Sequence, residues 1–159
     1  MFLKSYVELT MPFDEVRAAM DRRPRPWLNG LADAAERDGK RLLVDVGLEL
    51  HGHDVSRRAC LEVGEPVTAG RVSSLPFRLQ VEGSQLFPSL EGTLDAAWLG
   101  PDRTQVAIAA QYDPPLGVLG RAVDRALLHR VAEAVAQHFL ETVAERLASR
   151  LTAAGGPAP

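Results

Sequence analysis

The sequence predicts an α+β domain in which an antiparallel sheet is covered on one face by helices. Residues 40–112 alternate between apolar and polar side chains, which is the period of half-buried strands. From Pro115 to Leu151 the apolar side chains recur instead at helical spacing. Residues 3–37 add one strand and two short helices ahead of the sheet.

Size and charge narrow the class of protein. The chain has 159 residues, of which 46 % are hydrophobic and 25 % charged, so it is long enough for one domain with its own core. We expect that domain to span residues 1–151, with residues 152–159 as a flexible tail. The net charge of −3 and the lack of a basic stripe argue against a nucleic-acid partner.

Membrane insertion and secretion are not expected either. No window approaches the run of about 18 consecutive apolar residues that a membrane-spanning helix requires. The residues after Met1 form no positively charged stretch that leads into an apolar run, and Cys60 is the only cysteine. We therefore expect a cytoplasmic protein without disulfides.

The N-terminal segment is expected to form a strand over residues 3–10, where apolar and polar side chains alternate. A helix follows over residues 12–20, with proline and acidic side chains in its first turn, where they suit the positive end of the helix dipole. Pro24 and Pro26 interrupt the pattern, and a second short helix is expected over residues 27–37.

Six consecutive strands with short connections are expected next, which predicts an antiparallel meander with one covered face. The expected strands cover residues 42–50, 55–63, 67–74, 75–81, 90–98 and 106–112. Connections are expected at residues 51–54, 64–66, 82–84 and 100–102. Pro76 marks a bulge or an edge between two of these strands.

The C-terminal helix is expected to have Asp113 as its N-cap and Pro114 as its first residue. Its apolar stripe consists of Leu116, Leu119, Val123, Leu127, Val131, Val135, Phe139, Val143, Leu147 and Leu151. One straight helix of this extent would be roughly 54 Å long and would overhang a domain about 40 Å across. We therefore expect a break between Gly120 and His129, which leaves about 25 residues on the sheet.

The order of these elements resembles the START-like, or SRPBCC, superfamily, whose helix-grip fold occurs in polyketide cyclases and lipid-transfer domains. Residues 7–9 followed by residues 12–16 are similar to the usual opening of that superfamily, in which a strand leads to a short helix. The run 112–117, continued through 120–121 and 124–125, is similar to the strand-to-helix junction of one bacterial branch. The resemblance implies a curved antiparallel sheet of six to seven strands around the long helix, with an apolar tunnel between them.

The resemblance also implies that this tunnel binds a hydrophobic small molecule or lipid. We expect no cofactor and no metal. The expected lining residues have inward register at mid-strand or mid-helix: Val46, Leu48, Leu61, Phe77, Leu79, Leu94, Trp98, Ile108, Tyr112, Val131, Val135, His138 and Phe139. The same side chains can instead interdigitate as a solid core, because protein interiors pack densely. Both interpretations are open at this point.

Two polar side chains are candidates for catalysis in such a tunnel. His138 lies beside Phe139 on the helix, and its imidazole would suit acid–base chemistry near neutral pH. Tyr112 ends the last strand and can donate a hydrogen bond into a pocket. Each has a structural alternative, which is a solvated helix flank for His138 and a packed ring for Tyr112.

Three other groups of residues are better explained without chemistry. His51, His53 and Asp54 offer zinc ligands, but a polar turn accounts for them. Cys60 has no histidine partner in the sequence, so a nucleophilic role is not expected. Residues 117–121 place glycines and an arginine at a helix start, but they match no phosphate-binding motif.

The sequence favours a non-enzymatic carrier or sensor of an apolar ligand. The alternative is a cyclase, dehydratase or hydrolase that uses the same cavity. A protein-interaction module, similar to the chaperone-activating members of the superfamily, is the third hypothesis. It requires an exposed apolar patch, which the largely polar outward registers do not favour.

Overall fold

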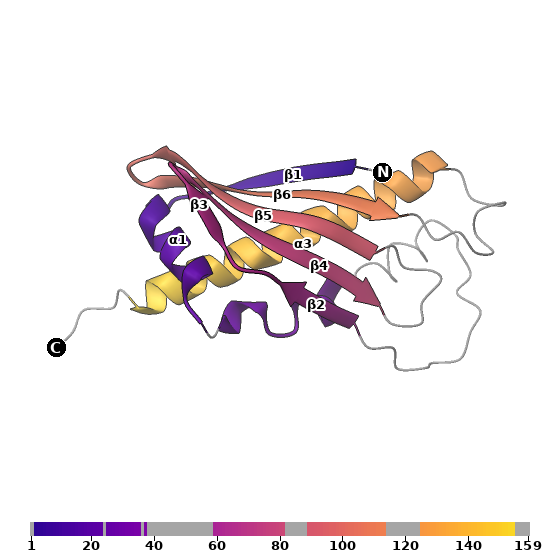
Figure 1. The fold of residues 1–159 in the computed structure, drawn as a ribbon, viewed down its shortest axis with the longest axis horizontal. Helices are drawn as coiled ribbons and strands as arrows, with labels where there is room; N and C mark the ends of the chain where they lie inside the picture. Colours follow the sequence, from indigo (N-terminus) through magenta and orange to yellow (C-terminus); the bar gives the residue numbers. More distant parts are fainter. Residues whose placement is uncertain are drawn as a thin grey trace.

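A computed structural model of the chain describes residues 2–23, 25–35, 37, 59–81, 89–113 and 125–154 (Figure 1). The elements are β1 (Phe2–Leu9), α1 (Phe13–Asp21), the 3₁₀ turn η1 (Pro26–Leu28), β2 (Ala59–Val63), β3 (Val67–Ala69), β4 (Val72–Val81), β5 (Ser89–Gly100), β6 (Arg103–Asp113) and α3 (Arg125–Ala154). Residues 31–35 are also helical. The α+β class, the short N-terminal helical segments and the long C-terminal helix are confirmed.

Six antiparallel strands form one sheet, and α3 lies across its inner face (Figure 1). The order across the sheet is β1-β6-β5-β4-β2, with β3 also paired to β4. β4 pairs antiparallel with β5, and a tight hairpin joins β5 to β6, so the predicted meander is confirmed for these strands. β1 pairs with β6, which brings the first and last strands side by side and places β1 at one edge.

The connection at residues 64–66 does not reverse the chain, contrary to the prediction. β2 and β3 both run antiparallel to β4 along the same edge, and residues 64–66 interrupt that edge between them. The chain reverses at Gly70, whose φ of +59° glycine adopts without steric strain. The predicted strand over 67–74 is therefore two strands joined by a tight turn, and β4 runs unbroken to Val81.

Pro76 lies inside β4 rather than between two strands. Its carbonyl oxygen accepts a hydrogen bond of 2.8 Å from the Gly64 N–H. A strand residue directs its N–H and C=O groups to the same side, so the nitrogen of Pro76 faces the break between β2 and β3. Only the return hydrogen bond to Gly64 is lost there, where the neighbouring edge is already interrupted, which explains how a proline fits inside this strand.

The inner face of the sheet is apolar, as the alternation predicts. The apolar side chains buried on it are Leu75, Phe77 and Leu79 of β4, Leu90, Leu94 and Ala96 of β5, and Val106, Ile108, Ala110 and Tyr112 of β6. Leu3 continues this face onto β1, whereas Tyr6 points to the opposite face and is exposed. This layer supplies the apolar burial that stabilises the fold.

α3 buries one face against this layer, but not along the predicted stripe. The buried side chains of the helix are Ala132, Ala136, Phe139, Leu140, Val143, Ala144 and Leu147. Four residues turn about 400°, so a stripe that steps by four drifts about 40° around the helix at each repeat. Val143 and Leu147 therefore lie on the buried face, whereas Val131 and Val135 are only partly buried.

The N-terminal helical segments close one end of the core. Three side chains of α1 are buried there: Phe13, Val16 and Met20. Trp27 Nε1–H donates a hydrogen bond of 3.2 Å to the carbonyl oxygen of Ala19, which ties η1 to α1. Arg146, near the end of α3, donates to the carbonyl oxygens of Trp27 and Asn29 and ties the long helix to the same turn.

α3 is continuous from Arg125 to Ala154, a length of about 45 Å, and it runs past the predicted end at Leu151. The break expected between Gly120 and His129 is absent from Arg125 onward. The predicted helix start at Pro114, the strand over 42–50 and the connections over 51–54 and 82–84 lie outside the described residues. None of the helices in the described part is both long and apolar enough to cross a membrane.

Gly92, in the middle of β5, is a position where the sheet has no room for a side chain. A Cβ at this residue would overlap the carbonyl oxygen of Ala109 and lie 2.6 Å from the Cα of Ala110, both on β6. Gly92→Ala is therefore expected to lower the free energy of unfolding by about 1–3 kcal/mol, because the backbone of β6 must shift. Chemical denaturation of the variant measures this loss.

Gly100→Ala is the matched control, since a Cβ at Gly100 meets no atom within 4 Å and the residue has no positive φ. We expect the control to retain the stability of the wild type. Equal stabilities of the two variants would contradict the close approach of β5 and β6 at Gly92.

Candidate functional site

An apolar chamber lies between the sheet and α3, on the side of the core nearest β2. Eight side chains from five elements form it: Trp27 and Leu28 of η1, Leu61 and Val63 of β2, Leu75 and Phe77 of β4, Leu94 of β5 and Phe139 of α3. They leave about 10 Å³ of free space. That volume is at the lower limit of what one water molecule needs, so the chamber is almost closed by its own side chains.

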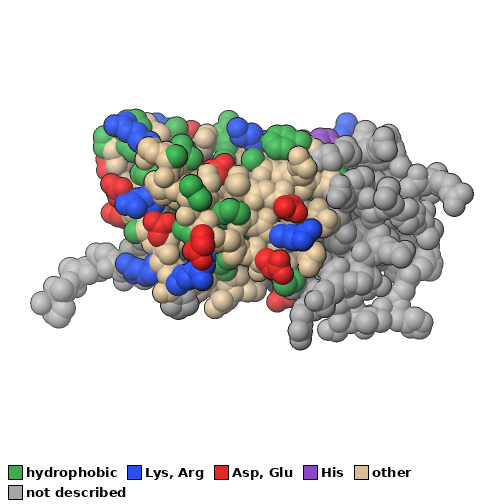
Figure 2. All heavy atoms as spheres, viewed as in Figure 1, with side chains coloured by type: hydrophobic (Ala, Val, Ile, Leu, Met, Phe, Trp, Pro, Cys, Tyr) green, Lys and Arg blue, Asp and Glu red, His purple; other side chains and the backbone are tan. Residues whose placement is uncertain are grey.

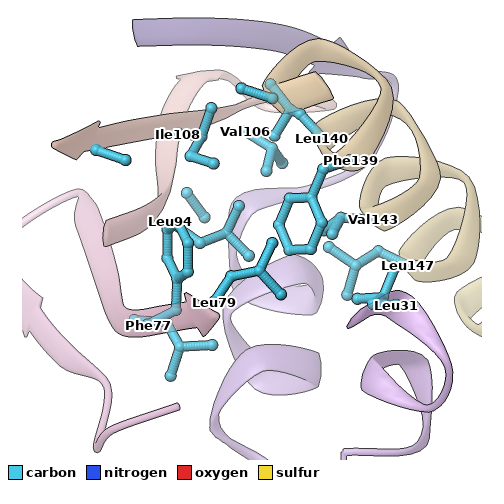
Figure 3. Close-up of a cluster of buried hydrophobic side chains, with 14 of the residues drawn as sticks. Leu31, Phe77, Leu79, Leu94, Val106, Ile108, Phe139, Leu140, Val143 and Leu147 are labelled. Atoms are coloured by element: carbon cyan, nitrogen blue, oxygen red, sulfur yellow. The ribbon is translucent and has the colours of Figure 1, made fainter. Parts of the chain in front are cut away.

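The position of α3 explains why the chamber lies there. The helix is closest to β1 and β6, so long side chains bridge the space between α3 and the strands β4 and β2. Phe77 of β4 and Phe139 of α3 do this with stacked rings, whose centroids are 5.9 Å apart at an interplanar angle of 25°. Figure 3 shows the two rings facing each other, with Leu79 and Leu94 beside them.

Four residues that the sequence proposed as lining meet in the chamber: Leu61, Phe77, Leu94 and Phe139. Leu79 and Ile108 are buried in the surrounding core. Four chamber residues were not proposed: Trp27, Leu28, Val63 and Leu75. Val63 and Leu75 share the inward registers of residues that were proposed, whereas the two η1 residues give no such signal because a 3₁₀ turn has no long periodicity.

The other proposed lining residues lie elsewhere. Trp98 is exposed at the end of β5, where its ring is covered by the guanidinium group of Arg71 at 3.9 Å instead of by α3. Val131 and Val135 lie on the partly buried flank of α3. Val46 and Leu48 fall outside the described residues.

Tyr112 starts a chain of polar contacts that leads from the core to solvent. Its hydroxyl lies 3.1 Å from Nδ1 of His129, and the two rings are stacked with centroids 5.9 Å apart. Nε2 of His129 lies 3.3 Å from the carboxylate oxygen Oε1 of Glu133, one turn further along α3. Tyr112 is 1 % exposed, whereas the side chains of His129 and Glu133 are 33 % and 55 % exposed.

These contacts are compatible with one placement of the hydroxyl proton of Tyr112 and the ring proton of His129. When the tyrosine O–H donates to Nδ1 of His129, Nε2 carries the imidazole proton and faces the Glu133 carboxylate. Burial raises the pKa of the Tyr112 hydroxyl above its ordinary value, and the negative charge of Glu133 raises it further. Near neutral pH, Tyr112 is therefore a hydrogen-bond donor and not a tyrosinate base.

Of the two residues proposed for catalysis, the structure buries Tyr112 and leaves His138 partly exposed. The imidazole that contacts Tyr112 belongs to His129, which the sequence did not single out. The spacing of His129 and Glu133, four residues apart on one helix, was the available signal. Their approach to Tyr112 is a long-range contact that depends on where α3 crosses β6.

The remaining groups give no site in the described part of the chain. No three His, Cys, Asp or Glu side chains of that part lie close enough to hold a metal ion. Cys60 is half-buried in β2. The possible zinc ligands at 51–54 and the glycines and arginine at 117–121 lie outside the described residues.

A larger hollow of about 790 Å³ crosses the outer face of the sheet. Three charged side chains in one cross-strand row form part of its wall: Glu62, Arg78 and Glu91. Figure 2 shows acidic and basic side chains gathered on this face. An apolar ligand in such an open groove would remain in contact with water, so the apolar chamber is the better candidate site.

Tyr112 gives the protein a predictable loss of stability in alkali. Its pKa is raised in the folded chain, so above about pH 10 the unfolded chain releases this proton first and the free energy of unfolding falls as the pH rises. Below that pH both states are protonated and the effect is absent. We expect Tyr112→Phe to remove part of the alkaline loss, measured by urea denaturation between about pH 9 and 11.

Tyr6→Phe is the matched control, because the Tyr6 side chain is exposed and its removal should leave the pH profile unchanged. The chain has only two tyrosines, so the absorbance of tyrosinate in this control reports the ionisation of Tyr112 alone. A midpoint no higher than that of free tyrosine would contradict the buried position of the hydroxyl.

Comparison with known proteins supports the fold. No family model matches the chain, and no curated protein matches it. Among solved structures, a conserved protein from Geobacillus kaustophilus is similar with a TM-score of 0.50 and 17 % identity, over 94 % of this chain and 96 % of that one. A second similar structure is the Zhui aromatase/cyclase from a Streptomyces species, with a TM-score of 0.47, 14 % identity and 99 % of each chain covered. A third is a START superfamily protein from Mycobacterium smegmatis, with a TM-score of 0.45 and 12 % identity, over 96 % of this chain and 98 % of that one.

The architecture of the chain agrees with the likeness to the Geobacillus kaustophilus protein, which concerns the fold alone. A first strand leads into short helical segments, an antiparallel sheet follows, and a long C-terminal helix crosses the inner face of that sheet. The resemblance derived from the sequence named the same arrangement. The chain has a helix-grip fold, in which an antiparallel sheet packs against a long C-terminal helix.

Proposed function

We propose that the chain binds a hydrophobic small molecule or lipid between the sheet and α3, with the apolar chamber at the centre of the site. The observation that carries this proposal is the convergence of eight apolar side chains from five elements on one interior space. Ligand sites in proteins are mostly apolar, with a few placed polar groups. The tunnel that the START-like resemblance implies lies in the same place.

A ligand must displace side chains, because the chamber holds only about 10 Å³ of free space. Phe77 and Phe139 are the largest groups that face each other across it. Rotation of these rings out of their stack opens the most volume. An apolar ligand then replaces the contacts that the two rings now make with each other, so the interior stays densely packed in both states.

Access to the chamber is expected beside β2. Leu61 and Val63 of this strand are partly buried, whereas Leu75 and Phe77 behind them are buried. A molecule that enters between β2 and η1 therefore first displaces side chains that already contact solvent. This route requires no separation of the hydrogen-bonded strands β4, β5 and β6.

A ligand with one polar group suits this interior better than a pure hydrocarbon. One cross-strand row runs over the inner face from Leu61 through Leu79 and Leu90 to Tyr112. The row is apolar up to Tyr112, whose hydroxyl and His129 partner are the polar groups at its end. The proposed ligand is therefore a flat or elongated apolar molecule with a hydroxyl, carbonyl or carboxyl group at one end.

The binding proposal is tested with N-phenyl-1-naphthylamine, an uncharged dye that fluoresces in apolar sites. We expect the full chain to bind the dye saturably. Leu61→Trp should weaken binding by about tenfold or more, because the indole fills the chamber from the β2 side. Val67→Trp is the matched control and should bind as the wild type does, since Val67 lies along the same sheet edge but is exposed.

Native mass spectrometry of the protein purified without added ligand gives an independent result. An apolar compound that stays bound to the wild type and is missing from Leu61→Trp would support the proposal. A folded chain, verified by circular dichroism, that neither binds the dye saturably nor carries any compound would refute it.

A second candidate function is acid–base catalysis in the same site. The series of polar contacts from Tyr112 through His129 to Glu133 favours it. When Nδ1 of His129 carries the imidazole proton instead and donates to the tyrosine oxygen, the Tyr112 O–H can turn to a ligand oxygen and donate to it. The test uses 2-naphthol, whose ionisation is visible in its absorbance. If Tyr112 stabilises an oxyanion, the bound naphthol ionises at lower pH in the wild type than in Tyr112→Phe, and equal midpoints would leave binding as the function.

A further inference from the structure

β1 forms an edge of the sheet, and in the described part of the structure no strand pairs with its second side. The strand has eight residues, Phe2–Leu9, and all of them are paired with β6 on the other side. A free edge of this length presents a row of backbone N–H and C=O groups that can pair with another strand.

The side chains of β1 form a self-complementary pattern. Lys4, Tyr6 and Glu8 point to the outer face and are exposed. Lys4 precedes Tyr6 by two residues, and Glu8 follows it by two residues. When this strand meets an antiparallel copy of itself with Tyr6 at the centre, each cation faces an anion.

The inner side of the same edge is hollow. A groove of about 320 Å³ lies between β1 and α3, and its lining includes Leu3 and Ser5 of the strand and Ala134 and Ala136 of the helix. Ser5 Oγ donates a hydrogen bond to Oε1 of Gln137 beside this groove. The groove provides room for the side chains of an added strand.

We propose that two copies of the chain pair through β1 about a two-fold axis that passes between their Tyr6 residues, perpendicular to the sheet. The paired strands are antiparallel, and one continuous sheet then crosses the dimer. Lys4 lies opposite the partner's Glu8, and Glu8 lies opposite the partner's Lys4. On the inner face, Leu3 lies opposite the partner's Leu9.

Symmetry and charge select this register. An axis perpendicular to the sheet keeps both inner faces on the same side, so residues that meet must both point inward or both point outward. An axis centred on Ser5 would place Lys4 opposite Tyr6, and one centred on Val7 would place Glu8 opposite Tyr6. Neither alternative forms an ion pair, whereas the axis at Tyr6 forms two.

The same register fills the groove between β1 and α3. The partner's Val7 lies opposite Ser5 and points to the inner face, where the groove is lined by Leu3, Ser5, Ala136, Glu133 and Gln137. Burial of Leu3, Ala136 and the partner's Val7 in both copies adds to the backbone hydrogen bonds of the paired edges. The proposed interface therefore has a mixed apolar and polar inner layer and a charged outer layer.

The exposed charges on β1 have a competing explanation, because natural proteins place charged side chains on edge strands to prevent pairing. Glu8 also forms an ion pair with Arg103 of β6 in its own chain. The two charges of β1, however, are opposite in sign and symmetric about Tyr6, which favours one self-pairing over others. The two explanations differ in the outcome they predict for charge reversal.

Sedimentation velocity of the full chain over a range of concentrations tests the proposal. We expect the wild type to dimerise reversibly. Lys4→Glu and Glu8→Lys each place like charges opposite one another, so each should raise the dimer dissociation constant about tenfold or more. An equimolar mixture of the two variants should recover the wild-type constant, because position 4 of each copy then faces the opposite charge at position 8.

Arg78→Glu and Glu91→Lys are matched controls, since they make the same changes of net charge on the interior strands β4 and β5. Neither should change the dimer. A wild type that stays monomeric at every concentration would overturn the proposal. So would a mixture that contains no more dimer than either variant alone.

A register-specific cross-link keeps the test independent of the Glu8–Arg103 ion pair. In a Cys60→Ser background, Tyr6→Cys should form an intermolecular disulfide on oxidation with copper–phenanthroline, because position 6 lies opposite itself. Phe2→Cys is the control, since Phe2 and Tyr6 lie on the same strand and are both 60 % exposed. Equal rates of cross-linking for the two variants would reject the register.

Discussion

The contact of α3 with the β1 and β6 side of the sheet is the constraint on which the rest of the structure depends. Leu140, Val143 and Leu147 are buried on the core-facing side of the helix, and Arg146 fixes the helix end to η1. Because the helix backbone lies to one side, only side chains can cover the inner face of β4 and β2. Phe77 and Phe139 provide that cover, so the apolar chamber is a consequence of where the helix lies.

The strands could be predicted because their signal is local. Alternation over 90–98 and 106–112 locates β5 and β6, since each side chain reports its own face. Which strands pair is not a local property. Residues 64–66 contain glycine and proline, which are typical both of a chain reversal and of an interruption in an edge strand. Only the pairing of β3 with β4 shows that these residues interrupt the edge and do not reverse the chain.

In the candidate site, too, local patterns could be predicted from the sequence and long-range contacts could not. Leu61, Phe77 and Leu94 follow from inward register, and Tyr112 extends the register of Ile108. His129 was missed because a step of four residues drifts off the buried face, whereas five turns of about 3.6 residues connect His129 to Leu147 on one face. Even the helical repeat of 3.6 residues does not identify the strand that this face of α3 contacts.

In the proposed binding function, packing and binding compete for the same side chains in the chamber. The stack of Phe77 on Phe139 stabilises the closed form, so the proposed ligand would bind only to the fraction of molecules in which the rings have moved. If one molecule in about a hundred is open, the apparent dissociation constant is about a hundredfold weaker than that of the open form, or roughly 2.7 kcal/mol. A ligand overcomes this cost only by burying more apolar area than the two rings lose, at about 25 cal/mol per Å². This favours a molecule longer than one ring, which spans the row from Leu61 to Tyr112 and gains a hydrogen bond at its polar end.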